Sequence, residues 1–210
     1  MLDTKFKQNQ KIDAEYRGQS VTYPTPRFVG LIVASAGQSP RSTVVALNAY
    51  TVPATLNGRL YKCTTGGTTG SGEPTWPTTA AGTVTDGTAV WTEQTTALYG
   101  GTIPEGSATG YARVSYASTL ANWSGTQGAG TTVASTGATG QISNNNAIAF
   151  AQVTTSLGLV VGFAMYDAST SGNAWEYCIQ ATGTPTTVGA NISPNIAAGA
   201  AVIGYDINAQ

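Results

Sequence analysis

The stretch that decides the fold is LVVGFAMYDASTSGNAWEYCIQA, residues 159–181. Two runs rich in β-branched and aromatic residues, 159–167 and 174–181, flank a short segment of Ala, Ser, Thr, Gly and Asn. Such runs favour β-strands, and small polar residues between them are typical of a turn. Asp167 is expected to form this turn, with Gly172 or Asn173 supplying a positive φ. The stretch therefore predicts two strands joined by a tight connection.

The same β pattern extends along the chain from residue 27 onward. Further strands are expected at 27–35, 42–50, 59–63, 88–93, 111–118, 147–153 and 201–207, with no helix between them. The segment 125–145, GTQGAGTTVASTGATGQISNN, is low in complexity and is expected to form a long loop or an irregular hairpin. The predicted fold class is all-β, an antiparallel β-sandwich or barrel.

The N-terminus carries the one predicted helix, a short amphipathic one at residues 2–17. Asp3 is a candidate cap, and Gly18 is expected to end the helix. Because a helix this short is marginal in isolation, its apolar stripe is expected to dock. The stripe either covers an edge of the chain's own sheet or binds another protein. Its members are Leu2, Phe6, Ile12 and Tyr16.

Charge is scarce in this sequence. Charged residues make up 9% of the chain, against roughly 25% in ordinary globular domains, and the formal net charge is −1. Arg113 is the last basic residue, and we expect it to form a structural salt bridge with Glu105, Asp167 or Glu176. The few clustered basic residues near the N-terminus alternate with acidic ones, so nucleic-acid binding is not expected. No apolar run reaches the length of a membrane span, and the N-terminus lacks the pattern of a signal peptide, so no membrane insertion is expected.

No cofactor, metal site or enzymatic activity is expected. Histidine is absent, which removes the commonest general base. Cys63 and Cys178 lack metal-ligand spacing and are expected to be unlinked thiols. The asparagines at 144–146 lack nearby carboxylates for calcium binding. Glu73 and Asp86 could form a catalytic pair, but a turn explains Asp86 better.

Residues 73–93, EPTWPTTAAGTVTDGTAVWTE, form an aromatic segment with two open interpretations. The Asp-Gly pair at 86–87 lies between two β-type runs and predicts a two-residue type I′ hairpin. Tyr61, Trp76 and Trp91 could stack on a sugar ring as a glycan platform, or they could form the core of a small β-unit. Trp91 is expected to be mainly core, and Trp76, which has a proline on either side, is expected to be the more exposed.

Two resemblances to bacteriophage proteins cover nearly the whole chain. Residues 58–91 follow G-x-x-Y-x-C-T-x-x-G-T-T-G-x-x-E-P-x-W-P…G-T-x-x-D-G-x-x-x-W, which resembles a small β-module that recurs in tail and other virion proteins. The segments KFKQNQKIDAEYRG, TYPTPRFVGLIVAS, GYARVSY, SNNNAIAF and LGLVVGFAMYDASTSGN are similar to a phage family commonly labelled tail-fibre-like protein. Together the resemblances imply a helical arm at 1–20, a main β-domain at 21–41 plus 99–210, and an inserted Trp-rich β-module at 42–98.

The resemblances imply a non-enzymatic virion structural protein that is assembled in the host cytoplasm. We expect it to form a homo-oligomer, with a trimer favoured and residues beyond Gly110 supplying much of the interface. We expect the helix to bind other virion proteins of the tail, collar or capsid. Three alternatives stay open at this point: a capsid decoration protein, an adhesin that binds a host surface glycan, and an enzyme that degrades surface polysaccharide.

Overall fold

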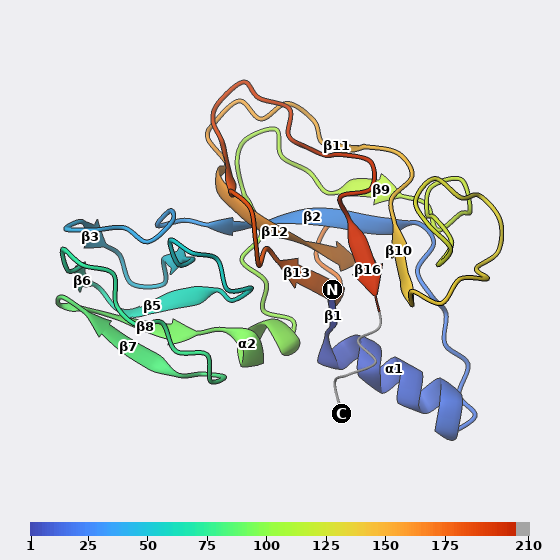
Figure 1. Cartoon of the computed structure of the whole chain (residues 1–210), viewed down its shortest axis with the longest axis horizontal. Helices are drawn as coiled ribbons and strands as arrows, with labels where there is room; N and C mark the ends of the chain where they lie inside the picture. Colours follow the sequence, from blue (N-terminus) through green and yellow to red (C-terminus); the bar gives the residue numbers. More distant parts are fainter. Residues whose placement is uncertain (205–210) are drawn as a thin grey trace.

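The structure is a computed structural model that describes residues 1–204. The described chain consists mainly of short strands in several antiparallel sheets, with two short helices (Figure 1). The all-β prediction is confirmed. The segment 42–98 lies at one end of the molecule, the largest sheet is central, and the N-terminal helix projects below the opposite end in this view.

The central sheet has the strand order β1-β13-β12-β2-β9, with β14 also paired to β12, and all its pairs are antiparallel. Its two longest strands, β2 and β12, come from the stretches with the strongest apolar pattern. The edge strand β1 comes from the N-terminus. The bounds are β1 Leu2–Asp3, β2 Arg27–Ala34, β9 Val114–Tyr116, β12 Gly158–Tyr166, β13 Ala174–Ile179 and β14 Thr186–Val188.

The hairpin of β12 and β13 forms as the sequence predicts. Asp167 closes the turn, because its carboxylate accepts hydrogen bonds from the backbone N–H and the side-chain amide of Asn173, at 2.7 and 3.0 Å. Gly172 has a φ of 70°. Within β12, Gly162 passes so close to β13 that a Cβ atom would lie 2.0 Å from the carbonyl oxygen of Cys178. Glycine is therefore required where these two strands meet.

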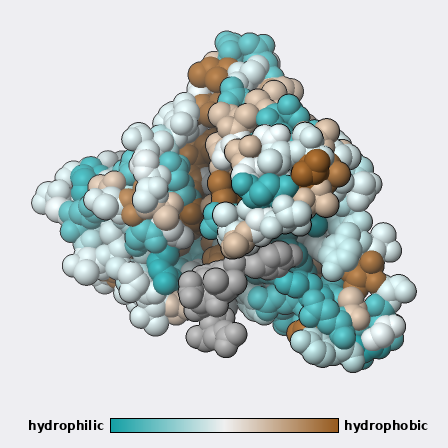
Figure 2. All heavy atoms as spheres, turned by 45° about the vertical axis from the view of Figure 1, so that its right-hand side comes forward, coloured by the Kyte–Doolittle hydropathy of each residue, from teal (hydrophilic) through white to brown (hydrophobic). Residues whose placement is uncertain are grey.

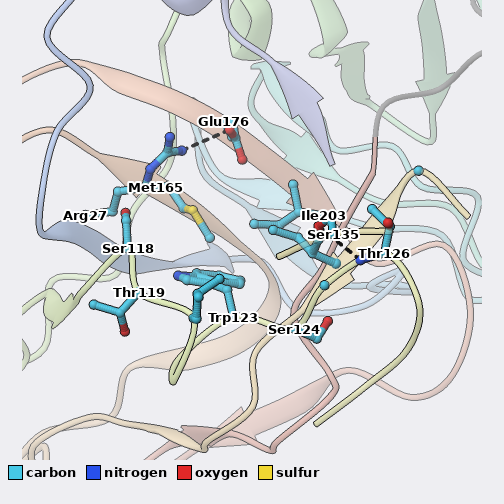
Figure 3. Close-up of a pocket in the computed structure, with 14 residues that line it drawn as sticks. Arg27, Ser118, Thr119, Trp123, Ser124, Thr126, Ser135, Met165, Glu176 and Ile203 are labelled. Atoms are coloured by element: carbon cyan, nitrogen blue, oxygen red, sulfur yellow. Dashed lines mark hydrogen bonds and ion pairs between the residues drawn. The ribbon is translucent and has the colours of Figure 1, made fainter. Parts of the chain in front are cut away.

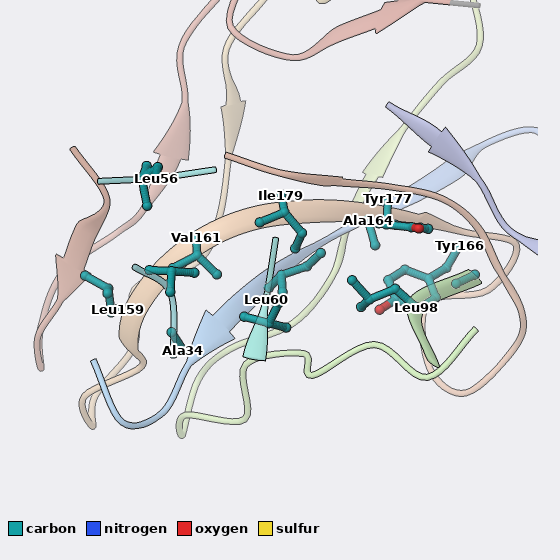
Figure 4. Packing of buried hydrophobic residues seen from close by; sticks show 13 residues of the cluster. Ala34, Leu56, Leu60, Leu98, Leu159, Val161, Ala164, Tyr166, Tyr177 and Ile179 are labelled. Carbon is teal, nitrogen blue, oxygen red and sulfur yellow. The ribbon is translucent and has the colours of Figure 1, made fainter. Parts of the chain in front are cut away.

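Both faces of the central sheet are buried, which makes the molecule sandwich-like. In β2, Ile32 and Ala34 point into one apolar core, and Val29 and Leu31 point into a second core on the other face. Strand β12 supplies side chains to both cores as well, and a register shift between Val160 and Gly162 changes which alternate residues face each core. Figure 4 shows the first core, where residues of the segment 42–98 and of α2 pack on the sheet. These residues are Val52, Leu56, Leu60 and Leu98.

The segment 42–98 also has a sheet and a core of its own. Its four-stranded sheet has the order β4-β5-β8-β7, and β3 pairs with β6 beside it. A third core forms around Tyr61 and Trp91. A short helix, α2, follows β8 where none was expected. The bounds are β3 Val44–Val45, β4 Tyr50–Thr51, β5 Tyr61–Thr65, β6 Gly67–Thr68, β7 Thr83–Asp86, β8 Ala89–Glu93 and α2 Thr95–Tyr99.

Two narrow ribbons cover the second core. They are β10 (Gln141–Ser143) with β16 (Val202–Gly204), and β11 (Ile148–Ala149) with β15 (Asn195–Ile196). The expected strands at 42–50, 111–118 and 147–153 are shorter than predicted, and positions 205–207 of the last expected strand lie outside the described residues. Between β10 and β11, the Asn144 side chain donates to the carbonyl of Ala197 and accepts from the N–H of Ala201, so it connects the two ribbons to the segment before β16.

The N-terminal helix, α1, spans Lys5–Tyr16 and so begins three residues later than expected. Thr4, not Asp3, is its N-cap, and the Thr4 hydroxyl accepts from the N–H of Lys7. Leu2 and Asp3 instead form β1, which pairs with the free edge of β13. Gly18, with a φ of 64°, follows the end of the helix as predicted. Leu2 therefore belongs to a strand, not to the helical stripe.

Candidate functional site

The first candidate surface is α1, whose base is fixed to the central sheet. The Thr4 hydroxyl donates to the carbonyl oxygen of Ala174 at 2.6 Å, and the Thr4 N–H donates to that of Trp175 at 3.0 Å. Further along the helix, Gln8 accepts a hydrogen bond from the Tyr99 hydroxyl of α2 at 2.9 Å. The helix is thus held at its first turn by both the sheet and the neighbouring segment.

A buried ion-pair network strengthens this attachment. The ammonium of Lys7 pairs with the carboxylate of Glu176 and lies 2.9 Å from that of Asp3. The guanidinium of Arg27 reaches the same Glu176 oxygen at 3.0 Å, and Lys11 lies 3.4 Å from Asp3. Burial by itself would lower the pKa of Lys7, but attraction to Glu176 and hydrogen bonds to both carboxylates outweigh burial and raise it. Lys7 is therefore charged while buried.

The apolar residues of α1 do not all face the protein. Phe6 packs edge-on against Trp175, with 5.6 Å between ring centroids. Ile12 and Tyr16 point away, and 50% and 80% of their surfaces are exposed; Leu2 in β1 is 53% exposed. The inward face is mixed, because it carries the buried Lys7 and partly buried polar residues beside Phe6. The helix therefore differs from an ordinary surface helix, in which the whole apolar stripe faces the core.

The second candidate surface is the aromatic cluster of Tyr61, Trp76 and Trp91. Trp76 lies between the other two rings, at centroid distances of 4.5 Å from Tyr61 and 6.1 Å from Trp91. Tyr61 and Trp91 are fully buried, whereas Trp76 keeps part of its surface exposed. Only Trp76 can therefore meet a ligand from solvent. The binding of a glycan there stays a prediction.

Polar bonds hold the three rings in place. The indole N–H of Trp76 donates to Glu73 at 2.7 Å, and that of Trp91 donates to Asp86 at 3.2 Å. The Tyr61 hydroxyl donates to the carbonyl of Pro77 at 2.9 Å, and burial raises its pKa. The geometry is that of a structural core with one partly open edge.

Asp86 has a different role from the expected one. It is the last residue of β7 and pairs with Ala89, so the connecting turn is Gly87-Thr88. Of the two turn residues only Gly87 has a positive φ, 64°, which fits a type II′ turn and corrects the predicted type I′. The buried Asp86 carboxylate accepts two bonds from the guanidinium of Arg41, at 2.9 and 2.7 Å.

Arg113 forms the structural salt bridge that the sequence indicates, and its partner is Glu105. Its Nε and Nη2 lie 2.7 to 3.0 Å from the Glu105 carboxylate, and Nη1 donates to two carbonyls of the β12–β13 turn. The guanidinium also stacks over the ring of Tyr166 at 3.3 Å. The Tyr111 hydroxyl donates to Glu105 and accepts from the N–H of Leu31, at 3.0 and 2.7 Å. The ion pair of Arg113 and Glu105 therefore connects the β12–β13 turn and, through Tyr111, strand β2.

The described residues, 1–204, contain no group of three or more His, Cys, Asp or Glu side chains that could hold a metal ion. Cys63 and Cys178 are both free thiols, and burial raises the pKa of each. Over the same residues, neither helix is long and apolar enough to cross a membrane.

Sequence reasoning missed the most heavily buried part of the arm. The spacing of Asp3, Lys7 and Lys11 at every fourth residue signals neighbouring charges on one helix face. It contains no signal for Glu176, which comes from the far end of the chain. The pairing of these charges depends on β1 joining β13, and a two-residue strand has no readable pattern.

Comparison with known protein families shows the class of protein to which the chain belongs. A family model described as Podophage GP4 fiber I protein gp80 matches residues 88–204, more than half of the chain, from β8 through β16. The match identifies a bacteriophage fibre protein, which is a component of the virion. The chain belongs to the Podophage GP4 fiber I protein gp80 family. No curated protein matches it. Helix α1 and Trp76 lie outside the matched range.

Proposed function

We propose that this phage fibre protein acts in virion assembly, binding another virion protein through α1 and associating with copies of itself. The observation that carries the proposal is the outward position of two apolar side chains: Ile12 and Tyr16 are exposed on a helix whose base is held by a buried ion pair. A helix already fixed in this way loses little further freedom on binding, so its exposed apolar side chains can contribute to affinity. Docking in an apolar groove is a common means of burying such a helix face.

Self-association is supported by the distribution of charge. Beyond Arg113 the only charged side chains are Asp167, Glu176 and Asp206. Centres of protein interfaces are depleted in charged residues, and closed symmetric oligomers are the usual outcome for identical subunits. We propose a trimer whose interface lies mainly beyond Gly110. Light scattering at tens of micromolar tests this, and a clean monomer would contradict it.

In this proposed role the protein has no enzymatic activity, needs no cofactor and binds no nucleic acid. We further propose that it is assembled in the host cytoplasm. Its partner belongs to the tail, the collar or the capsid. A decoration role on the capsid uses the same α1 surface with a different partner. An adhesin role at the aromatic cluster has less support, because Trp76 is covered by Tyr61 and Trp91 on part of its surface.

The test replaces the two outward residues by Ile12→Glu and Tyr16→Glu, with the protein supplied in trans to a phage that lacks it. Both side chains are exposed, so the double variant is expected to fold normally. Its copy number per virion, measured by quantitative mass spectrometry, is expected to fall about tenfold or more, because the new charges must be buried against the partner.

The matched control adds the same two charges at exposed positions, Asn9→Glu and Gln19→Glu. It is expected to enter virions at the normal copy number. If the Ile12 and Tyr16 double variant is incorporated as well as the control, attachment does not use α1.

A further inference from the structure

Two hollows border the second core, apart from both surfaces above. The cavity in Figure 3 has a volume of 550 Å³, lies beside Trp123, and is lined in part by Arg27 and Glu176, which are ion-paired with each other. The other hollow is a groove of 650 Å³ over Phe163, and among residues 1–204 no charged side chain lines it. Both volumes are in the range of small-molecule sites. The groove over Phe163 therefore has only neutral side chains with which to hold a ligand.

The groove lies where β12 changes its partner strand. Residues 158–160 of β12 pair with β14, and residues 162–166 pair with β13, so the connection 180–185 leaves the sheet between the two pairings. The N–H of Gln180 donates to the carbonyl of Val161 at 2.8 Å and holds the start of this connection. Beside β15, the N–H of Phe150 donates to the carbonyl of Pro194 at 2.9 Å. Because backbone bonds already fix these walls, little ordering is needed when a ligand binds.

The floor of the groove is apolar and contains one aromatic ring. Its residues belong to the second core or pack against it. They are Leu31, Val160, Phe163, Val188 and Ile196. Such a floor favours a ligand that has an apolar face of its own.

The walls carry hydroxyl and carboxamide groups that are left for a ligand or water. Six polar side chains line the groove, and none of them makes a side-chain hydrogen bond to another of the residues 1–204. They are Gln180, Thr184, Thr186, Thr187, Ser193 and Asn195. In the cavity beside Trp123, by contrast, Ser124 Oγ accepts from the N–H of Ser143, and Thr126 Oγ1 donates to the carbonyl of Gly137, both at 2.9 Å. The groove over Phe163 thus offers both donors and acceptors above an apolar floor.

These groups favour a neutral ligand with several hydroxyls. An ion withdrawn from water needs an opposite charge, and no lining side chain supplies one. Burial raises the pKa of the Cys178 thiol, and the N-terminal ammonium acts against this effect, but Met1 does not line the groove. A ligand hydroxyl both donates and accepts, so it can bond to either end of a carboxamide.

We propose that this groove binds a neutral saccharide, with its apolar face over Phe163 and its hydroxyls bonded to the carboxamides of Gln180 and Asn195. The site is distinct from the aromatic cluster of the segment 42–98. The inference does not depend on assembly through α1, because it is tested on the isolated protein.

The experiment titrates the full chain with maltose, lactose and cellobiose and follows side-chain carboxamide signals by NMR. The variants Gln180→Leu and Asn195→Ser assign the two signals of the groove. At least one disaccharide is expected to shift both signals saturably. The carboxamide signal of Asn144, which is 1% exposed and does not line the groove, is expected to stay in place.

A matched pair of variants locates the binding site. Thr184→Arg introduces a long side chain at an exposed position of the lining and is expected to weaken binding by about tenfold or more. Thr182→Arg is the control, because Thr182 is an exposed threonine of the same connection that does not line the groove. Its affinity should stay within about twofold of the wild type.

Glucose, glucosamine and glucuronate are titrated in parallel as a neutral, a cationic and an anionic probe. Glucose is expected to bind more tightly than either charged probe. The proposal is overturned if none of the disaccharides shifts the Gln180 and Asn195 signals, if Thr184→Arg binds as well as Thr182→Arg, or if a charged probe binds more tightly than glucose. All three outcomes leave assembly through α1 unaffected.

Discussion

The ammonium group of Lys7 in α1 is paired with the carboxylate of Glu176 in β13, and the two side chains are only 4% and 3% exposed. Their positions are 169 residues apart in the sequence. The pair fixes the N-terminal helix to the centre of the fold. It also explains why Ile12 and Tyr16 can face outward while the helix stays docked.

Replacing Lys7 is expected to destabilise the protein strongly. Lys7→Ala leaves Glu176 buried with one fewer cation, and removing one partner of a buried pair costs about 3–5 kcal/mol. Because Arg27 still contacts Glu176, we expect the lower part of this range. Denaturant unfolding measures the change. Lys5→Ala, at an exposed position of the same turn, is the control and is expected to stay within about 0.5 kcal/mol of the wild type.

The contribution of Lys7 to stability should be lost only in alkali. The pKa of Lys7 is raised in the folded protein above its ordinary value of 10.5, so folding favours the charged form. The stabilisation is fully present below that value and declines as the pH rises through the higher folded pKa. The difference in unfolding free energy between wild type and Lys7→Ala should therefore be constant from neutral pH to about pH 10 and shrink above it. A difference that already shrinks between about pH 7 and 9 would contradict the assignment.

The two tryptophans of the aromatic cluster should differ in their effect on stability. Trp91 is fully buried, so Trp91→Ala is expected to cost about 3–5 kcal/mol. Trp76→Ala removes a partly exposed ring and should cost less than half as much. Thermal or denaturant unfolding of the two variants decides this. Equal, large losses would mean that Trp76 is as much a core residue as Trp91.

The turn between β7 and β8 should tolerate only glycine at its first position. Gly87 has a φ of 64°, and a Cβ atom there would lie 2.3 Å from the carbonyl oxygen of Thr68. Gly87→Ala is expected to destabilise the protein by more than about 1 kcal/mol. Gly72→Ala is the control, because a Cβ at Gly72 meets nothing within 4 Å. Similar unfolding midpoints for both variants would contradict this view of the turn.

The sequence predicted what depends on local patterns and missed what depends on distant partners. The β12–β13 hairpin, its Asp167 turn and the buried Trp91 follow from periodicity and turn chemistry. The two-residue strands β1, β11 and β15 are too short for periodicity. They form because the sheet edge or ribbon opposite supplies hydrogen-bond partners.

The candidate surfaces show the same contrast between features with a local sequence pattern and features that depend on distant partners. The apolar stripe of α1 was visible in the sequence, but its orientation was not, because burial of Lys7 depends on Glu176 and Arg27. The cavity beside Trp123 and the groove over Phe163 gave no sequence signal, since the lining of each comes from several separated segments. On the face shown in Figure 2 most of the surface is polar, and apolar residues are concentrated in a hollow and a few isolated patches. Composition alone could not locate them.

The most direct test of assembly through α1 is a cryo-EM reconstruction of the whole virion at a resolution that places helices. The account predicts that in every copy the outward face of α1, with Ile12 and Tyr16, lies against another virion protein. It also predicts that copies are grouped about a threefold axis and that the segment 42–98 points away from the attachment point. A map in which α1 faces solvent while the segment 42–98 makes the contact with the virion would contradict the account.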